Sequence, residues 1–450
     1  MTAWLHVIGV GEAGIAALPP AMRTIIGFAE TVLGPPRFLS QLEQEIEQRA
    51  ETAPESAESV TQRSLDAVAR ALLEDHAPPV PERPADAPAL IPWQGKLDGM
   101  LAQIERLRDT PTVILATGDP MWFGIGATLA RRLAPDEFEV HPHVSSFQLA
   151  AAELRWPLQH LALLSLHGRP PELVQPHILP GARILALTAD ADTVAHVADI
   201  LTARGYGDSP LTVLESLGGP DQRVTTRIAA RFDPGEIGDF HVLAIDCVAD
   251  RDALVLPPVI GLPDDAFVSD GQLTKREVRA ITLSKLLPLP RALLWDVGAG
   301  SGSIAIEWMR AARDAEAIAF ERDDERLEMI ATNAAALGAP TLRVIAGEAP
   351  ESFASQPAPD AVFIGGSVGH EALFAACWHA LKPGGRLVAN AVTLDGERAL
   401  YERHSRHGGD LVRLEVAAVD FLGGQRIMRP RLAVTQWSVT KPAQYLVASS

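Results

Sequence analysis

Short runs of aliphatic and β-branched residues alternate along the chain with longer segments in which apolar positions recur at helical spacing. Apolar runs of this length are typical of buried strands, and strands that alternate with helices predict α/β domains with largely parallel sheets. The predicted strands are residues 5–10, 112–116, 183–188, 211–214, 293–297, 317–320, 361–364 and 385–389.

Two stretches interrupt this alternation. Residues 47–92 are rich in Ala, Glu and Pro, which predicts an insertion that carries a helix followed by a mobile loop, and we assign it no chemistry. Residues 249–271 are rich in Pro and Asp and separate two regions with different glycine motifs. We therefore expect one domain at 1–248, a linker and domain entry at 249–271, and a second domain at 256–450.

Composition and charge narrow the class of protein. A chain of 450 residues with 47% hydrophobic and 21% charged residues is expected to form two or three packed domains. Its only cysteines, Cys247 and Cys377, exclude a disulfide framework and a cysteine-based zinc site, and they fit a reducing compartment. No signal peptide or membrane-length apolar run is present, so we expect a soluble cytoplasmic protein. The net charge of −18 argues against nucleic acid as a partner.

The strongest motif follows the strand at 293–297. An Asp-x-Gly-x-Gly-x-Gly turn leads from it into a helical pattern and consists of Asp296, Gly298, Gly300 and Gly302. Glycines here let a bound nucleotide approach the backbone at a strand end, where ligands of doubly wound sheets bind. A plain structural turn is the alternative.

Later strand ends supply further cofactor candidates. Glu321 comes 25 residues after Asp296, where a carboxylate can accept hydrogen bonds from ribose hydroxyls, although it could also be a solvated charge. Gly347, Glu348 and Ala349 follow the third strand, and Gly365 and Ser367 follow the fourth. A methyltransferase is expected to hold adenine near the first group and the departing methyl near the second.

The C-terminal motifs resemble a known family. The glycine turn, together with the Lys-Pro-Gly-Gly segment at 382–385, is similar to the class I methyltransferases, which have a Rossmann-like fold. With the segment 274–280, it resembles the precorrin C15-methyltransferase (decarboxylating) family over about residues 256–450. Three basic residues of that segment, Lys275, Arg276 and Arg279, suit the carboxylates of a corrin precursor. They could instead form a solvated face with Glu277 as a partner.

The N-terminal region carries different motifs. Gly9 and Gly11 follow the first strand, and Gly118, Asp119 and Pro120 follow the strand at 112–116. Ser145 and Ser146 precede an apolar helical pattern. The simpler alternatives are a turn shaped by Asp119 and a helix cap formed by the serines. His141, His143 and His167 are candidates for carboxylate binding or acid–base work, but none is assigned as a catalytic base.

Together these segments resemble the tetrapyrrole methylases, or class III methyltransferases, and within them the precorrin C5-methyltransferase branch, over about residues 3–247. The resemblance implies two α/β lobes with S-adenosylmethionine folded in the cleft between them. It also implies that the Gly118–Pro120 loop and the serine pair contact the cofactor.

The two resemblances imply one bifunctional enzyme of cobalamin biosynthesis, with one S-adenosylmethionine per domain and no metal. The expected reaction is methylation of precorrin-6B at C5 and C15 with decarboxylation of the C12 acetate, giving precorrin-8X. Methyl transfer needs alignment and desolvation rather than a covalent nucleophile, so no catalytic residue is named. A cobalt-precorrin substrate, a tRNA-base methyltransferase and a non-enzymatic tetrapyrrole carrier remain alternatives. The family also implies a homo-oligomer, possibly a tetramer through the C-terminal domain.

Overall fold

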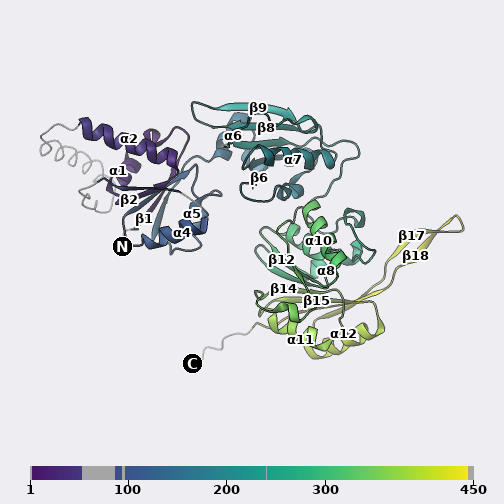
Figure 1. Cartoon of the computed structure of the whole chain (residues 1–450). Helices are drawn as coiled ribbons and strands as arrows, with labels where there is room; N and C mark the ends of the chain where they lie inside the picture. The colour runs from purple at the N-terminus through teal and green to yellow at the C-terminus, as the bar shows by residue number, and fades with distance from the viewer. Residues whose placement is uncertain (1–2, 53–86, 94–96, 240, 444–450) are drawn as a thin grey trace, which may run out of the picture.

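The computed structural model describes residues 3–52, 87–93, 97–239 and 241–443. Three α/β units follow one another along the chain, each built on its own sheet, and Figure 1 shows them as a first lobe, a second lobe and a C-terminal unit. The α/β class expected from the alternation of strands and helices is confirmed. Among the described residues, no helix is both long and apolar enough to cross a membrane.

The first lobe has a fully parallel sheet in the order β3-β2-β4-β1-β5. Alternate side chains of β1 enter opposite cores: Ile8 and Val10 pack with α1 and α2, and Leu5 and Val7 pack with α4 and α5. The elements are β1 (Leu5–Val10), α1 (Pro20–Phe28), β2 (Thr31–Gly34), α2 (Pro36–Thr52), β3 (Ala89–Pro92), α4 (Leu97–Arg106), β4 (Thr112–Thr117), α5 (Ile125–Leu129) and β5 (Phe138–His141).

The second lobe has a mixed sheet in the order β6-β7-β10-β8-β9, in which only β6 and β7 are parallel. The expectation of largely parallel sheets is wrong for this lobe. The turn between β8 and β9 is too short for the crossover that parallel strands require. The elements are α6 (Ser146–Leu154), β6 (Leu161–Ser165), β7 (Arg183–Leu187), α7 (Ala191–Ala203), β8 (Pro210–Glu215), β9 (Arg223–Ile228) and β10 (His241–Asp246).

The C-terminal unit has a seven-stranded sheet in the order β13-β12-β11-β14-β15-β19-β16, whose last two strands are antiparallel to their neighbours. Helices α8, α9 and α10 cover one face, and α11 and α12 cover the other. The elements are α8 (Arg276–Leu286), β11 (Leu293–Val297), α9 (Ser303–Ala311), β12 (Glu316–Glu321), α10 (Asp324–Ala336), β13 (Arg343–Ala346), β14 (Ala361–Ile364), α11 (Glu371–Ala380), β15 (Arg386–Ala391), α12 (Leu394–His407), β16 (Asp410–Leu414) and β19 (Val434–Thr440).

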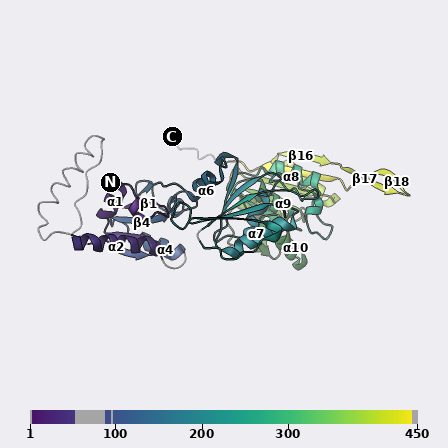
Figure 2. The ribbon, with the colours of Figure 1, turned by 90° about the horizontal axis from the view of Figure 1, so that it is seen from above.

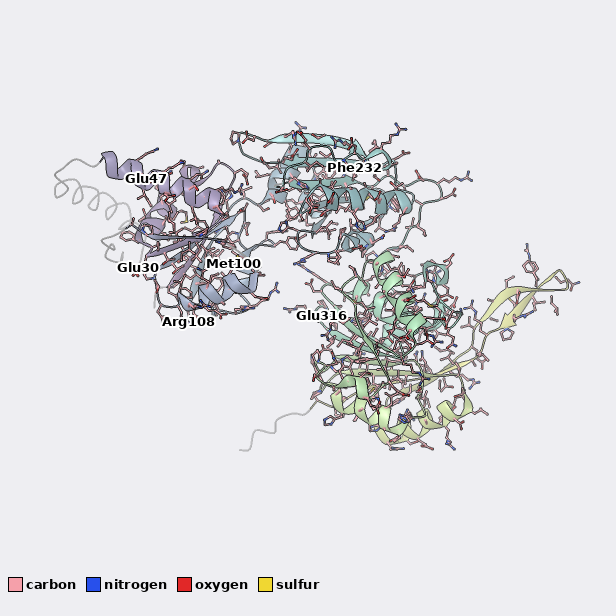
Figure 3. All side chains as sticks on the ribbon, in the orientation of Figure 1. Glu30, Glu47, Met100, Arg108, Phe232 and Glu316 are labelled. Carbon is pink, nitrogen blue, oxygen red and sulfur yellow. The ribbon has the colours of Figure 1, made fainter. Side chains whose placement is uncertain are left out.

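A two-stranded arm, β17 (Ala417–Leu422) and β18 (Gln425–Pro430), projects from the C-terminal unit (Figures 1 and 2). Side chains on this arm stand clear of the rest of the protein (Figure 3). Short 3₁₀ helices lie at Ile15–Ala17, Leu158–His160, Pro171–His177, Ala229–Arg231, Asp264–Ala266 and Glu351–Phe353.

The expected linker at 249–271 accepts hydrogen bonds from the units that precede and follow it. In the second lobe, Arg204 donates to the Leu254 carbonyl at 2.8 Å, and in the C-terminal unit Arg310 donates to the Leu256 carbonyl at 2.7 Å. Most of the expected insertion at 47–92 lies outside the described residues, but β3 at its end completes the first sheet.

Candidate functional site

The C-terminal candidate site lies at the carboxyl ends of β11, β12 and β14. The chain runs outward from β11 to β12 and β13 on one side and returns through β14 and β15 on the other, so a topological switch point lies between β11 and β14. The turn after β11 has φ angles of 73°, 59° and 77° at Gly298, Gly300 and Gly302, a region that other residues rarely adopt. The glycines therefore shape an open turn at the place where ligands of such sheets bind.

Asp296, at the end of β11, is a buried carboxyl with an incomplete set of partners. Its Oδ2 accepts a hydrogen bond from the Ala305 amide at 3.1 Å, whereas its buried Oδ1 has no partner among the residues that the structure describes. Burial raises the pKa of Asp296 to about 7, and the nearby charge of Glu321 adds a smaller contribution in the same direction. A buried acceptor without a donor is costly, and a ligand that supplies one would relieve that cost.

Glu321 lies beside the glycine turn and is only 6% exposed, so it is not a solvated surface charge. Its Oε2 accepts from the Gly300 amide at 2.9 Å, and its backbone carbonyl accepts from the Gly347 amide at 3.0 Å. These bonds join the turn to the loop after β13. In that loop Glu348 is exposed and pairs with Arg322, and Ala349 packs against the core.

The loop after β14 borders the same turn. The Gly365 amide donates to the Val297 carbonyl at 3.1 Å, and a Cβ on Gly365 would lie 3.3 Å from the Gly298 carbonyl oxygen. Ser367, two residues on, is exposed and has a φ of 54°. The structure thus brings the predicted residues of β11, β12, β13 and β14 to one edge of the sheet.

Arg279 requires a correction. Its side chain is fully buried, and all three of its nitrogens donate to groups of the protein: Nε to Glu307, Nη1 to Asp264 and the Thr274 carbonyl, and Nη2 to the Leu262 carbonyl. It therefore holds α8, α9 and the entry segment together instead of facing a substrate.

The other two basic residues lie at the start of α8. Lys275 is partly exposed, and Arg276 is exposed. Glu277, considered as their partner, instead pairs with Arg431 at 3.1 Å. Lys275 and Arg276 therefore remain candidates for carboxylate recognition.

The N-terminal predictions converge on the end of β1. A Cβ on Gly9 would lie 2.5 Å from the Gly118 carbonyl oxygen and 2.5 Å from the His143 Cβ. A Cβ on Gly11 would lie 2.8 Å from the His143 ring. Only glycine allows these segments to approach so closely, and Gly118 in turn lies next to the serine pair, 3.9 Å from the Ser146 amide by the same measure.

Asp119 and Ser145 have the structural roles that the simpler interpretations proposed, shaping a turn and capping a helix. Asp119 Oδ1 accepts from the Met121 amide at 2.8 Å, which shapes the turn that begins with buried Pro120. Ser145 forms a capping box with Gln148 at the start of α6. Their place at the end of the first sheet remains compatible with cofactor contact through the backbone.

The sequence analysis did not identify several other side chains that lie near the end of β1. Arg37 forms an ion pair with Glu12, directly after the first glycine turn, and Glu12 approaches Gly219 of the second lobe. Trp122 and Phe123 are 48% and 42% exposed and contact Phe147 of the second lobe edge-on, with ring centroids 6.4 and 6.0 Å apart. Both aromatic residues lie just after the Gly-Asp-Pro motif in the sequence. This pair of adjacent aromatic residues, in a loop predicted to contact the cofactor, is the sequence signal that could have identified them.

A cavity of about 630 Å³ lies elsewhere, between α7 of the second lobe and α10 of the C-terminal unit. Its lining includes His196, Arg204, Leu254 and Leu337, and none of the predicted cofactor residues. It is therefore separate from both candidate sites.

Comparison with known proteins identifies the two halves. The family "Tetrapyrrole (Corrin/Porphyrin) Methylases" matches residues 5–230, and the family "Precorrin methyltransferase domain" matches residues 265–441. A protein of Sinorhizobium named precorrin-6Y C(5,15)-methyltransferase [decarboxylating] is 44% identical over 97% of this chain and 96% of its own length. The chain belongs to this family.

Other relatives carry the same name. A Mycobacterium tuberculosis protein is 42% identical over 73% of this chain and 82% of its own length. The solved C-terminal domain of the Rhodobacter capsulatus precorrin-6Y C5,15-methyltransferase is 43% identical, covers 41% of this chain and 100% of that chain, and has a TM-score of 0.40. The matches to the two family models and to the Sinorhizobium relative identify the chain as an S-adenosylmethionine-dependent C-methyltransferase with a tetrapyrrole methylase domain and a class I methyltransferase-like domain.

Proposed function

We propose that this chain methylates precorrin-6B at C5 and C15 and decarboxylates its C12 acetate, giving precorrin-8X. The observation that carries this proposal is the presence of two glycine-lined strand-end sites, on two different sheets of one chain, in a family named for two methylations. We assign C5 methylation to the first two lobes and C15 methylation with decarboxylation to the C-terminal unit, with the domains dividing at about 248–256.

Metal-free precorrin is the favoured substrate over its cobalt-containing analogue. The Sinorhizobium relative, which matches nearly the whole chain, is named for precorrin-6Y. The Salmonella typhimurium protein named cobalt-precorrin-6B C(15)-methyltransferase (decarboxylating) is 34% identical and covers 38% of this chain. The relative that matches both domains of this chain is therefore the one named for the metal-free substrate.

Each of the two methyltransferase domains is proposed to hold one S-adenosylmethionine. In the C-terminal unit, the residues present fit the cofactor: the open glycine turn admits it, Asp296 Oδ1 offers an unpaired acceptor, and Glu321 has lone pairs for ribose hydroxyls. In the first lobe, Gly9, Gly11, Gly118 and the serine pair offer backbone groups at the end of β1.

The bound cofactor supplies an electrophilic methyl group on a sulfonium, so the protein's residues have to align the two reactants and exclude water. In the first lobe, the exposed Trp122 and Phe123 rings offer a flat apolar surface beside the glycine turn. In the C-terminal unit, Lys275, Arg276 and Ser367 are the candidates for the substrate's carboxylates. The proton that replaces the departing carboxyl group has no assigned donor.

We further propose a soluble cytoplasmic enzyme that forms homo-oligomers, tetramers in particular, through the C-terminal unit. The arm supports this part of the proposal because its apolar side chains Val419, Phe421, Leu422 and Met428 are all more than 60% exposed. Exposed apolar clusters of this kind mark association surfaces.

The test is mass spectrometry of precorrin-6B after incubation with the full chain and S-adenosylmethionine. The wild type is expected to add two methyl groups and lose one carboxyl group. Asp296→Ala should add only the C5 methyl, and Gly118→Val, which places a branched side chain at a φ of 65°, should retain C15 methylation and decarboxylation.

Asp395→Ala, which changes an exposed carboxylate of α12, is the matched control and should behave as the wild type. An unchanged substrate mass, under conditions in which a known enzyme of this family works, would refute the proposal. Tetrapyrrole binding that ignores S-adenosylmethionine would then favour a carrier. Steeply salt-dependent RNA binding would favour a tRNA-base methyltransferase.

A further inference from the structure

A second kind of site lies in the first lobe, on the edge of its sheet. His6 of β1 and Glu139 of β5 are register partners in the parallel pair, and His141 follows Glu139 by two residues on the same strand. Side chains two residues apart on a strand lie on one face. Phe138 and Val140 pack into the core on the opposite face, so Glu139 and His141 project on the same side as His6.

The three side chains are close enough to share one ion. His6 Nδ1 lies 3.1 Å from His141 Nε2 and 3.7 Å from Glu139 Oε2, and one ligand atom from each residue lies within 4.8 Å of the other two. Zinc binds imidazole nitrogen and carboxylate oxygen at about 2.0–2.2 Å, which places neighbouring donor atoms roughly 3.0–3.5 Å apart. The observed spacing thus needs only small side-chain rotations to match.

The surroundings suit a bound cation with access to water. His6 and His141 are partly buried, whereas the Glu139 side chain is 60% exposed, so an ion can enter from the solvent side. The imidazole rings lie stacked, with centroids 5.3 Å apart, and are already ordered against each other.

We propose that His6, Glu139 and His141 form a binding site for a divalent transition-metal ion of the zinc class. Two imidazoles and one carboxylate supply three protein ligands and leave further positions to water. The ion would tie the edge strand β5 to β1. His143 follows the end of this strand by two residues, and its ring borders Gly11, so the tie would fix one wall of the proposed C5 cofactor site. The metal site itself is independent of the proposed methyltransferase function.

The experiment uses the untagged full chain, stripped of metal with a chelator and titrated with Zn²⁺ under equilibrium dialysis. We expect one site per chain that weakens about 100-fold in His141→Ala and at least about tenfold in Glu139→Gln, because loss of a ligand should cost at least as much as loss of its supporting contacts. Co²⁺ in place of Zn²⁺ should give visible absorption bands that the His141→Ala variant lacks.

Two controls keep the test decisive. His196→Ala removes the histidine of another exposed histidine–glutamate pair, His196 with Glu172 at 3.5 Å, and should leave Zn²⁺ binding unchanged. Glu139→Gln changes a largely exposed side chain and should keep the wild-type circular dichroism spectrum. The proposal fails if the wild type binds no Zn²⁺, or if His6→Ala/His141→Ala binds as much and as tightly as the wild type.

Discussion

At the scale of single residues, Asp296 shows how a functional position differs from a core position. Asp296 is the second-to-last residue of a strand whose other residues are apolar and buried, and within the described part of the chain its Oδ1 has no donor. Such a group reduces the stability of the folded protein unless something else compensates for it. This cost is consistent with a residue retained for binding rather than for folding.

The raised pKa of Asp296 gives a prediction with a defined sign. Because the pKa is about 7 in the folded state and lower in the unfolded state, the folded state is penalised increasingly as the pH rises towards 7. Asp296→Asn removes the titration, so without cofactor it should stabilise the β11 region relative to the wild type by roughly 2 kcal/mol more at pH 8 than at pH 5. Hydrogen exchange of the β11 peptide, compared between the two proteins at each pH, measures the difference. An equal difference at both pH values would contradict it.

At the scale of elements, the sequence predicted the strands that carry the motifs better than the strands that complete the sheets. β1, β11 and β14 match the predicted residues 5–10, 293–297 and 361–364, because each is a mostly apolar run next to a glycine turn. β2, β3, β5, β6, β9, β10 and the strands from β16 to β19 were not predicted. β3 and β5 are edge strands with few buried residues, so their apolar pattern is weak.

The role of Arg279 could not be predicted from its local sequence. Three basic residues within five positions resemble an anion-binding face, but the partner that decides the matter, Glu307, lies 28 residues away on another helix. Only the packing of α8 against α9 brings them together. By contrast, the capping box of Ser145 and Gln148 is a local pattern, and the cap was foreseen as an alternative.

The buried pair of Arg279 and Glu307 should matter far more to stability than a surface pair on the same helix. Glu307 accepts from Arg279 and from the Gly261 and Leu262 amides, so Glu307→Gln turns amide hydrogens towards these donors. The buried Arg279 cation also loses its buried anionic partner and keeps only the partly exposed Asp264. The cost should be about 3–5 kcal/mol, which lowers the melting temperature of the C-terminal unit by roughly 6 °C or more. Glu277→Gln, which breaks the exposed pair with Arg431, should cost less than about 1 kcal/mol. Scanning calorimetry measures the melting temperatures of both variants. Similar decreases in the two variants would contradict this prediction.

At the scale of the whole molecule, the two methyltransferase units are joined by a segment that both of them bind. Arg204 and Arg310 are buried and donate to carbonyls two residues apart, those of Leu254 and Leu256. Pro176 and Gln175 of the second lobe also approach Gly338 of the C-terminal unit so closely that a Cβ there would clash. The linker is therefore part of an interface between the two methyltransferase units. Its richness in proline and aspartate indicated a boundary between domains but not this interface.

The arm gives the last prediction, which concerns assembly. Phe421 and Leu422 are 61% and 64% exposed on a hairpin that projects from the C-terminal unit, and a lone two-stranded hairpin has little stability of its own in water. Another copy of the chain that covers this surface would explain both features. Phe421→Ser/Leu422→Ser should therefore shift the protein towards the monomer in sedimentation velocity. Leu394→Ser, at an exposed leucine of α12 outside the arm, should not. A wild type that sediments as a monomer at micromolar concentration would instead assign the apolar arm to a different partner, such as the substrate or another protein.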